Sequence, residues 1–416
     1  MNQDLLSKEM SSQTGGEDKQ EPTSGNDKTV TKGNPISRLF DFISGVFTSI
    51  LPALIGAGII QVIASVLLYL DIDSNFKIFT IVMYISGIVF YLLPFMVAVS
   101  AAKKLGSNIF IAAVIGGCSF FPSLTEVLKS AKEISSTSLP VAEPQYISSF
   151  ILILIAVWLA AKIEQGLGKL NRYSIQLLVA PTLTLIIIVP LLLFVFGPLW
   201  TTLAHTLSEE FSSLFFFNSE VLAGLLYGGT IPLLHFSGMK YMLVNDMLES
   251  VAATGYDYIA PVMVAAVMAQ AGAAFGVCIK SKNSKVKALA ATTGLLAMLG
   301  IIEPAMYGVN VRFKKPFLAA LIGGAIGGAF MCFFETALTA FSGLYGLMTL
   351  PLVTDSTLVY AVLGMVISFV TAGVITYFMG FADEQEEHSK GATASGISTA
   401  SDLVVEKSAN QLGDSN

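Results

Sequence analysis

The carboxylate of Glu303 stands alone inside an apolar stretch, in the run Gly-Ile-Ile-Glu-Pro-Ala-Met-Tyr-Gly at 300–308. An ionisable side chain in such surroundings is costly and is therefore a candidate for function. Because Pro304 breaks the helical ladder, we expect Glu303 to lie at the tip of a re-entrant segment, facing a cavity. There it could accept hydrogen bonds from two or more hydroxyl groups, which suits a sugar. The alternative is a structural carboxylate that caps freed backbone donors.

Lys240 is a cation well inside another apolar stretch, near 219–247. An ammonium group at that depth needs a partner, and Glu303, Asp246 or an anionic ligand could provide one. Snorkelling of the side chain to an interface is the simpler explanation. His235 precedes Lys240 by about 140° around a helix, so the two side chains cannot both face one cavity squarely. We interpret His235 as a packing residue.

Gln270 is a neutral amide among small residues, in the run Met-Ala-Gln-Ala-Gly-Ala-Ala at 268–274. Small residues let helix backbones approach closely, and an amide can both donate to and accept from a hydroxyl-rich ligand. Packing and ligand binding explain this residue equally well. The sequence contains no Walker-type loop, no Ser/His/Asp arrangement and no metal-ligand spacing. We therefore expect no cofactor, metal or catalytic residue, and ATP-driven pumping by this chain is disfavoured.

The elements that must position these side chains are membrane-spanning helices. Hydrophobic residues make up 54% of the chain and charged residues 12%, and the mean hydropathy is +0.72, whereas a soluble domain carries roughly 25% charged residues. The stretches 44–70 and 173–200 contain no charge and are long enough to cross roughly 30 Å of hydrocarbon. The composition predicts an all-α polytopic membrane protein with polar tails.

Apolar runs between charge clusters predict about ten membrane passes. They fall near 44–70, 77–102, 107–122, 147–163, 175–203, 219–247, 259–279, 288–302, 305–311, 316–336, 340–352 and 357–380. From 245 to 315 the pieces are short and interrupted by Gly and Pro. At membrane depth, irregular backbone is tolerated only where it is buried inside the protein or lines a cavity. Short hydrophobic segments interrupted by Gly and Pro therefore point to a transporter's binding site. Ordinary kinks and loops would give the same pattern.

Lysine and arginine clusters predict the orientation. They lie at 103–104, 162–172 and 280–287, and the positive-inside rule places these clusters and both termini in the cytoplasm. We expect a multi-pass membrane protein with the loop 123–146 outside. The tails, 1–35 and 383–416, are too polar to order themselves. No basic stripe with interleaved aromatic residues occurs, so nucleic-acid binding is not expected.

Several blocks together resemble one family, the membrane-permease subunit (enzyme IIC) of the bacterial sugar phosphotransferase system. The resemblance is to its glucose superfamily, in the sucrose/β-glucoside branch, and covers about 36–382. The blocks that carry it are 43–48, 51–54, 93–95, 101–106, 112–117, 255–257, 269–274, 300–310 and 314–317. Their order and spacing make the resemblance specific, although each block alone would be weak.

The resemblance implies a homodimeric permease of about ten transmembrane helices plus two re-entrant hairpins. About 44–205 would form a scaffold and dimerisation half, and about 218–381 a transport half that binds the sugar. In this family the bound sugar receives a phosphoryl group from a phosphocysteine of enzyme IIB and is released inside as a sugar phosphate. The family's sugar-binding glutamate falls on Glu303. The full set of expected substrate-binding residues is Glu303, Lys240, Gln270, Asn245, Gly238 and Pro304.

Three features depart from the family pattern. Ile302 replaces the usual threonine before the glutamate. Lys240 takes the place of a substrate-contacting histidine, because Gly238-Met239-Lys240 aligns without a gap. No Cys-x-x-Arg block follows any of the three cysteines, and nothing resembles a IIA domain. We therefore expect no phosphoryl-carrying residue in this chain, and IIB and IIA to act in trans or to be absent.

The expected function is a membrane permease for sucrose, a β-glucoside or a related saccharide, which a separate IIB phosphorylates. One alternative is a secondary transporter that has lost phosphoryl coupling, for a sugar or for a sugar acid that Lys240 would favour. Another is a non-transporting membrane sensor that binds sugar and signals through its tails. Phosphorylation-dependent uptake separates the first from the other two.

Overall fold

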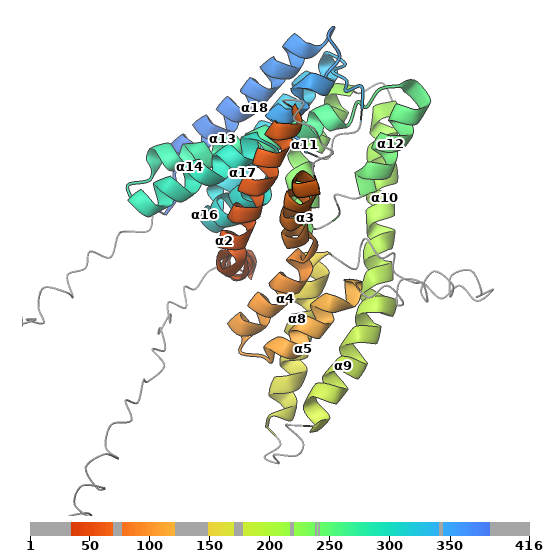
Figure 1. Cartoon of the computed structure of the whole chain (residues 1–416), viewed down its shortest axis with the longest axis vertical. Coiled ribbons are helices and arrows are strands. Elements are labelled where there is room, and N and C mark those ends of the chain that lie inside the picture. The colour runs from red at the N-terminus through yellow and green to blue at the C-terminus, as the bar shows by residue number, and fades with distance from the viewer. Residues whose placement is uncertain are drawn as a thin grey trace, which may run out of the picture. The chain divides into compact units, whose positions relative to one another are not determined.

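The computed structural model describes residues 35–69, 77–120, 149–169, 178–216, 220–237, 239, 242–340 and 344–382 (Figure 1). The expected polar tails, apart from Pro35, and the expected outer loop 123–146 lie outside these ranges. Within them the chain is helical, and its β-type pairing consists of two isolated bridges, Asp257 with Leu338 and Leu338 with Val353. The all-α polytopic fold predicted from the sequence is confirmed.

The first half of the described chain contains helices that follow the predicted apolar runs. They are α2 (Pro35–Tyr69), α3 (Lys77–Tyr91), α4 (Leu93–Leu105), α5 (Ile109–Gly117), the short η1 (Cys118–Phe120), α8 (Phe150–Leu167), α9 (Ala180–Leu191), the π-helix η3 (Leu192–Phe196) and α10 (Gly197–Phe216). Local signals set several ends. The side chain of Asn108 accepts hydrogen bonds from the first amides of α5, and Gly106 ends α4 in the left-handed conformation, as helix caps usually do.

The second half contains longer helices separated by broken segments. They are α11 (Glu220–Ser237), α12 (Met242–Thr254), α13 (Ala260–Lys280), α14 (Ser284–Met298), α15 (Glu303–Ala305), the π-helix η5 (Met306–Asn310), α16 (Val311–Phe313), α17 (Lys315–Phe333), the 3-10 helix η6 (Leu347–Leu352) and α18 (Leu358–Met379). The single span expected at 219–247 is wrong. It is two helices, because α11 ends at Ser237 and the next residue, Gly238, is a typical stop signal.

Six helices in the described ranges are long and apolar enough to cross a membrane, and a bent pair, α3 with α4, would make a seventh. The expected count of about ten passes included shorter runs. Those at 107–122 and 288–302 form α5, with 9 residues, and α14, with 15 residues. At 1.5 Å per residue these helices are about 14 and 22 Å long, less than the roughly 30 Å of hydrocarbon.

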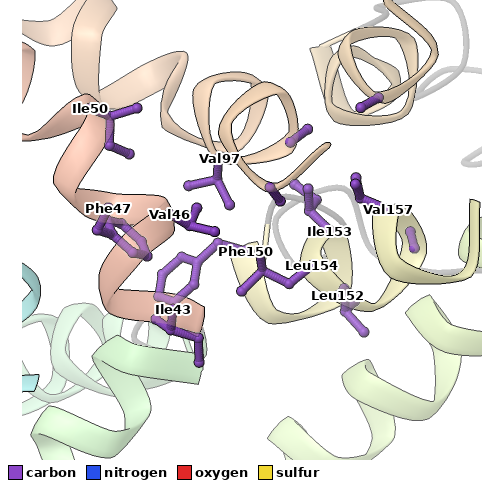
Figure 2. Close-up of a cluster of buried hydrophobic side chains, with 14 of the residues drawn as sticks. Ile43, Val46, Phe47, Ile50, Val97, Phe150, Leu152, Ile153, Leu154 and Val157 are labelled. Carbon is purple, nitrogen blue, oxygen red and sulfur yellow. The ribbon is translucent and has the colours of Figure 1, made fainter. Parts of the chain in front are cut away.

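A hydrophobic core joins α2, α4 and α8. Figure 2 shows Phe47 and Val46 of α2 beside Val97 of α4 and Phe150 of α8, and all four side chains are buried. The rings of Phe47 and Phe150 meet edge to face, with centroids 5.6 Å apart. These three helices lie in the half that the resemblance implies to be a scaffold, and the same core continues into the second half through residues such as Met306 and Tyr307.

Glycines allow very close packing in the second half, where α11 lies against α17 and α13 against α18 (Figure 1). A Cβ on Gly228 of α11 would lie 2.1 Å from the carbonyl oxygen of Gly324 on α17. A Cβ on Gly272 of α13 would lie 2.0 Å from that of Phe369 on α18. Small residues permit this approach, and it binds these helices into one tightly packed block.

Substitution of Gly228 by Ala should therefore destabilise the protein. The new methyl group would meet backbone, which cannot rotate away, so we expect a cost of about 1–3 kcal/mol or more. Gly56→Ala is the matched control, because a Cβ there has nothing within 4 Å. Thermal unfolding in detergent compares the two variants, and equal midpoints for them would contradict this packing.

Candidate functional site

Glu303 lies at the tip of a helical hairpin formed by residues 284–313. Helix α14 leads to a turn at 299–302, and the chain returns through α15, η5 and α16, which pack against α14 or its neighbours. Gly300 in the turn has φ +107°, a conformation that favours glycine. The segment that returns from the tip, residues 303–313, is called the return arm below.

Both open ends of this hairpin carry basic residues. Lys285 and Lys287 lie in the first turns of α14, Arg312 lies near the end of the return arm, and Lys314 follows it directly. Because α14 is only about 22 Å long, the chain can turn back before it crosses a bilayer. The positive-inside rule would then place both ends on one side. This is the geometry expected of a re-entrant hairpin.

Glu303 is the first residue of α15, and its side chain is half-buried. Pro304 follows in the first turn and is buried. A proline in that position costs no hydrogen bond, because the first amides of a helix have no intrahelical acceptor. Pro304 therefore starts the return arm rather than interrupting a longer helix, and this fixes the carboxylate at the tip.

Tyr307 anchors the return arm and was not among the residues singled out from the sequence. Its side chain is 1% exposed, and its ring stacks on Phe47 with centroids 3.8 Å apart and an interplanar angle of 9°. The edge of Phe150 closes the cluster at 5.4 Å. The hydroxyl group donates to the backbone carbonyl of His235 on α11, at 3.3 Å. The only local signal was its position four residues after Glu303, on the same side of a helix.

Helix α2 accompanies the return arm along its length. The Gly58 region of α2 meets Ile301 near the tip, where a Cβ on Gly58 would lie 3.3 Å from Ile301. At the other end Lys314 forms an ion pair with Asp41, with Nζ and Oδ1 2.6 Å apart. The expected scaffold half therefore lies directly against the segment that carries Glu303.

Gln270 does not point to open space. It is fully buried on α13, and its side-chain oxygen accepts a hydrogen bond from Asn310 Nδ2 at 2.7 Å. The same Asn310 nitrogen donates to the backbone carbonyl of Gln270 at 2.9 Å. Asn310 is the last residue of η5, so this pair joins the return arm to α13.

The other expected site residues are only partly described. Gly238 and Lys240 lie outside the described residues, and for Asn245 the structure describes the backbone, in α12, but not the side chain. His235 is buried, with Nδ1 3.3 Å from the carbonyl oxygen of Ile231 one turn earlier. Its burial agrees with the interpretation as a packing residue.

The side chain of Asp257 caps amide groups at the start of α13. Its side chain is fully buried, and Oδ1 accepts from the amides of Ile259 at 2.8 Å and Ala260 at 3.0 Å. Its backbone pairs with Leu338 in both directions, at 2.8 and 2.9 Å. Burial raises the pKa of Asp257 above its ordinary value, against the opposing effect of the two amide hydrogen bonds.

This raised pKa predicts a pH-dependent stability. The unfolded chain loses the proton of Asp257 at about pH 4, whereas the folded protein holds it to higher pH. Stability should therefore fall as the pH rises from about 4 through the raised pKa of the folded state. In Asp257→Asn the contribution of this carboxyl group should be missing, so the slope should be smaller. Thermal midpoints in detergent across this range test it, with the exposed Asp355→Asn as control; an equal slope in Asp257→Asn would contradict the assignment.

Comparison with known proteins identifies the family. Residues 44–324 match the family model described as "Phosphotransferase system, EIIC". The chain belongs to this EIIC family. The match includes Glu303, Gln270 and Asn310, and it covers the whole hairpin, α13 and the first part of α17.

Individual relatives of the EIIC chain carry names from the same system. It is 42% identical to the "PTS system beta-glucoside-specific EIIBCA component" of Bacillus subtilis over 360 residues, 86% of this chain and 59% of that protein. It is 31% identical to the "PTS system sucrose-specific EIIBC component" of Salmonella typhimurium over 366 residues, 86% of this chain and 80% of that protein. The EIIC chain thus spans about three fifths of the β-glucoside relative's length.

Proposed function

We propose that this EIIC chain is the membrane permease component of a sugar phosphotransferase system and carries a β-glucoside, sucrose or a related saccharide. The observation that carries the proposal is the position of Glu303, whose carboxylate lies at the tip of the hairpin in a chain of this family. The names of the relatives favour these sugars. A carboxylate can accept hydrogen bonds from two or more sugar hydroxyl groups.

The proposal assigns roles to the two halves of the chain. Residues 44–205 form the scaffold and a homodimer interface, and residues 218–381 bind and move the sugar. Glu303 contacts the sugar from the hairpin tip, with Pro304 fixing its position. Gly238, Lys240 and Asn245 are further substrate-binding residues in this proposal. Both termini face the cytoplasm of the bacterial cell in this proposal. It rests on the positive-inside rule, applied to the basic clusters at 103–104, 162–172 and 280–287.

The phosphoryl group comes from enzyme IIB in this proposal. The chain contains three cysteines, and none of them is the first residue of a Cys-x-x-Arg pattern. We expect vesicles that contain the EIIC chain to accumulate sugar phosphate only when IIB, IIA, the general phosphotransferase proteins and the phosphoryl donor are enclosed. Without IIB, purified EIIC chain incubated with labelled donor should stay unlabelled.

The same measurement decides against the alternatives. Accumulation of unmodified sugar at an equal rate without IIB would show an uncoupled secondary transporter. Sugar binding without uptake under any condition would show a sensor. Stoichiometric label on a cysteine or histidine of the chain would contradict the expectation that the carrier lies elsewhere. Radiolabelled sucrose and methyl β-glucoside are the substrates for these experiments.

A further inference from the structure

We infer that Gln270 and Asn310 form an amide clamp that positions the return arm, and so sets sugar affinity without touching the sugar. This inference rests on the proposed function of Glu303. It changes the role of Gln270 from a ligand contact, as expected from the sequence, to a positioning residue. It also adds Asn310, which the sequence presents only as the last residue of a family block.

The side chain of Asn310 holds Gln270 through two hydrogen bonds. Asn310 Nδ2 donates to two acceptors on one residue of α13, the carbonyl oxygen and the side-chain oxygen of Gln270, at 2.9 and 2.7 Å. Both side chains are completely buried. Two acceptors on one residue fix the arm both along α13 and around its own axis, which apolar contacts with alanines and glycines would not do.

Each of the two side-chain amides uses only one of its two polar atoms in this pair. Gln270 Nε2 and Asn310 Oδ1 are buried and make no hydrogen bond within the described part of the chain. Buried polar atoms without partners destabilise a protein, and replacing both members of a hydrogen-bonded pair by apolar groups of the same shape can be nearly neutral or stabilising. Stability alone therefore does not explain the pair. A buried polar pair can instead specify the register between helices.

The return arm links the clamp to Glu303. Glu303 begins the return arm, and Asn310 lies seven residues later at the end of η5. The segment between them is helical, so a shift at Asn310 is carried to the tip. A slip of one residue moves the arm by about 1.5 Å. In enzymes a misplacement of about 1 Å can lower a reaction rate by about 100-fold, and a hydrogen bond to a sugar hydroxyl likewise depends on the position of its acceptor. The clamp thus keeps the carboxylate where a sugar hydroxyl can reach it.

The test uses the full chain in detergent and three variants. The apolar pair Gln270→Met with Asn310→Leu removes the clamp while keeping its volume. The exchanged pair Gln270→Asn with Asn310→Gln keeps one long and one short amide. Thr376→Val is the control, because Thr376 Oγ1 is also buried without a partner in the described residues but lies on α18. Affinity for radiolabelled sucrose and methyl β-glucoside, thermal midpoint and hydrogen exchange over 299–313 are measured.

We expect the apolar pair to keep its thermal midpoint, to bind sugar about ten-fold or more weakly and to exchange hydrogen faster in the return arm. The exchanged pair should recover most of the affinity, and Thr376→Val should change neither affinity nor exchange. Unchanged affinity and exchange in the apolar pair would overturn the inference. So would a parallel loss of midpoint and affinity without recovery in the exchanged pair, which is the result of a merely structural role.

This outcome can be separated from a failure of the proposed function. If Glu303→Gln weakens sugar binding and the apolar pair does not, only the clamp is wrong. If Glu303→Gln leaves binding unchanged, the role of Glu303 is wrong whatever the clamp does. If neither sugar binds the unmodified protein, hydrogen exchange over 299–313 decides alone, and an unchanged rate in the apolar pair overturns the clamp.

Discussion

Replacing Glu303 with glutamine should weaken sugar binding about ten-fold or more, since each lost charge-assisted hydrogen bond is worth about 1.5–3 kcal/mol. Glutamine keeps the shape of the side chain but removes the charge, and it presents one acceptor where the carboxylate presents two. Because the side chain is half-buried at the hairpin tip, its desolvated charge should strengthen these bonds. Equilibrium binding of radiolabelled sucrose and methyl β-glucoside to folded protein measures the effect.

The matched control is Glu220→Gln. Glu220 is an exposed acid at the start of α11, so the same loss of one charge there should leave affinity unchanged. Equal affinities for Glu303→Gln and the unmodified protein would contradict the assignment of Glu303. Equal losses in both variants would show a general effect of net charge and would contradict it too.

The second large effect is expected at Tyr307. Replacement by alanine removes a buried ring that stacks on Phe47 and meets Phe150, and loss of a buried aromatic side chain typically costs about 3–5 kcal/mol. It also releases the return arm from α2, so sugar affinity should fall with stability. Tyr307→Phe keeps both ring contacts and loses one hydrogen bond of 3.3 Å, for a smaller cost of about 0.5–1.5 kcal/mol.

Thermal unfolding in detergent orders these variants. Phe378→Ala is the control, because Phe378 on α18 is 79% exposed and its loss leaves no cavity. The expected order of stability is unmodified protein and Phe378→Ala first, then Tyr307→Phe, then Tyr307→Ala. An equal loss for Tyr307→Ala and Phe378→Ala would mean that the aromatic cluster does not hold the arm.

The sequence by itself determined the class of the protein and much of its helix map. The run predicted at 259–279 is α13 at Ala260–Lys280, and the run at 357–380 is α18 at Leu358–Met379. The reason is physical. Whether a segment is apolar enough for hydrocarbon depends on its own composition, which local sequence contains in full.

Sequence also singled out Glu303, because the cost of a charge in apolar surroundings is visible in the residues on either side of it. The turn at Gly300 and the proline that follows the glutamate are local signals of the same kind. The sequence blocks also predicted that the chain belongs to the EIIC family, and the family match over 44–324 confirms this prediction.

Only the tertiary structure decided what holds the glutamate in place. The partner of Gln270 is 40 residues away, and the partners of Tyr307 lie on α2, α8 and α11. A local pattern cannot show such contacts, since the same buried amide or tyrosine suits a ligand, a helix or another side chain. The packing of distant helices selects the partner, and it made Gln270 part of a helix contact, where the sequence alone left packing and ligand binding equally open.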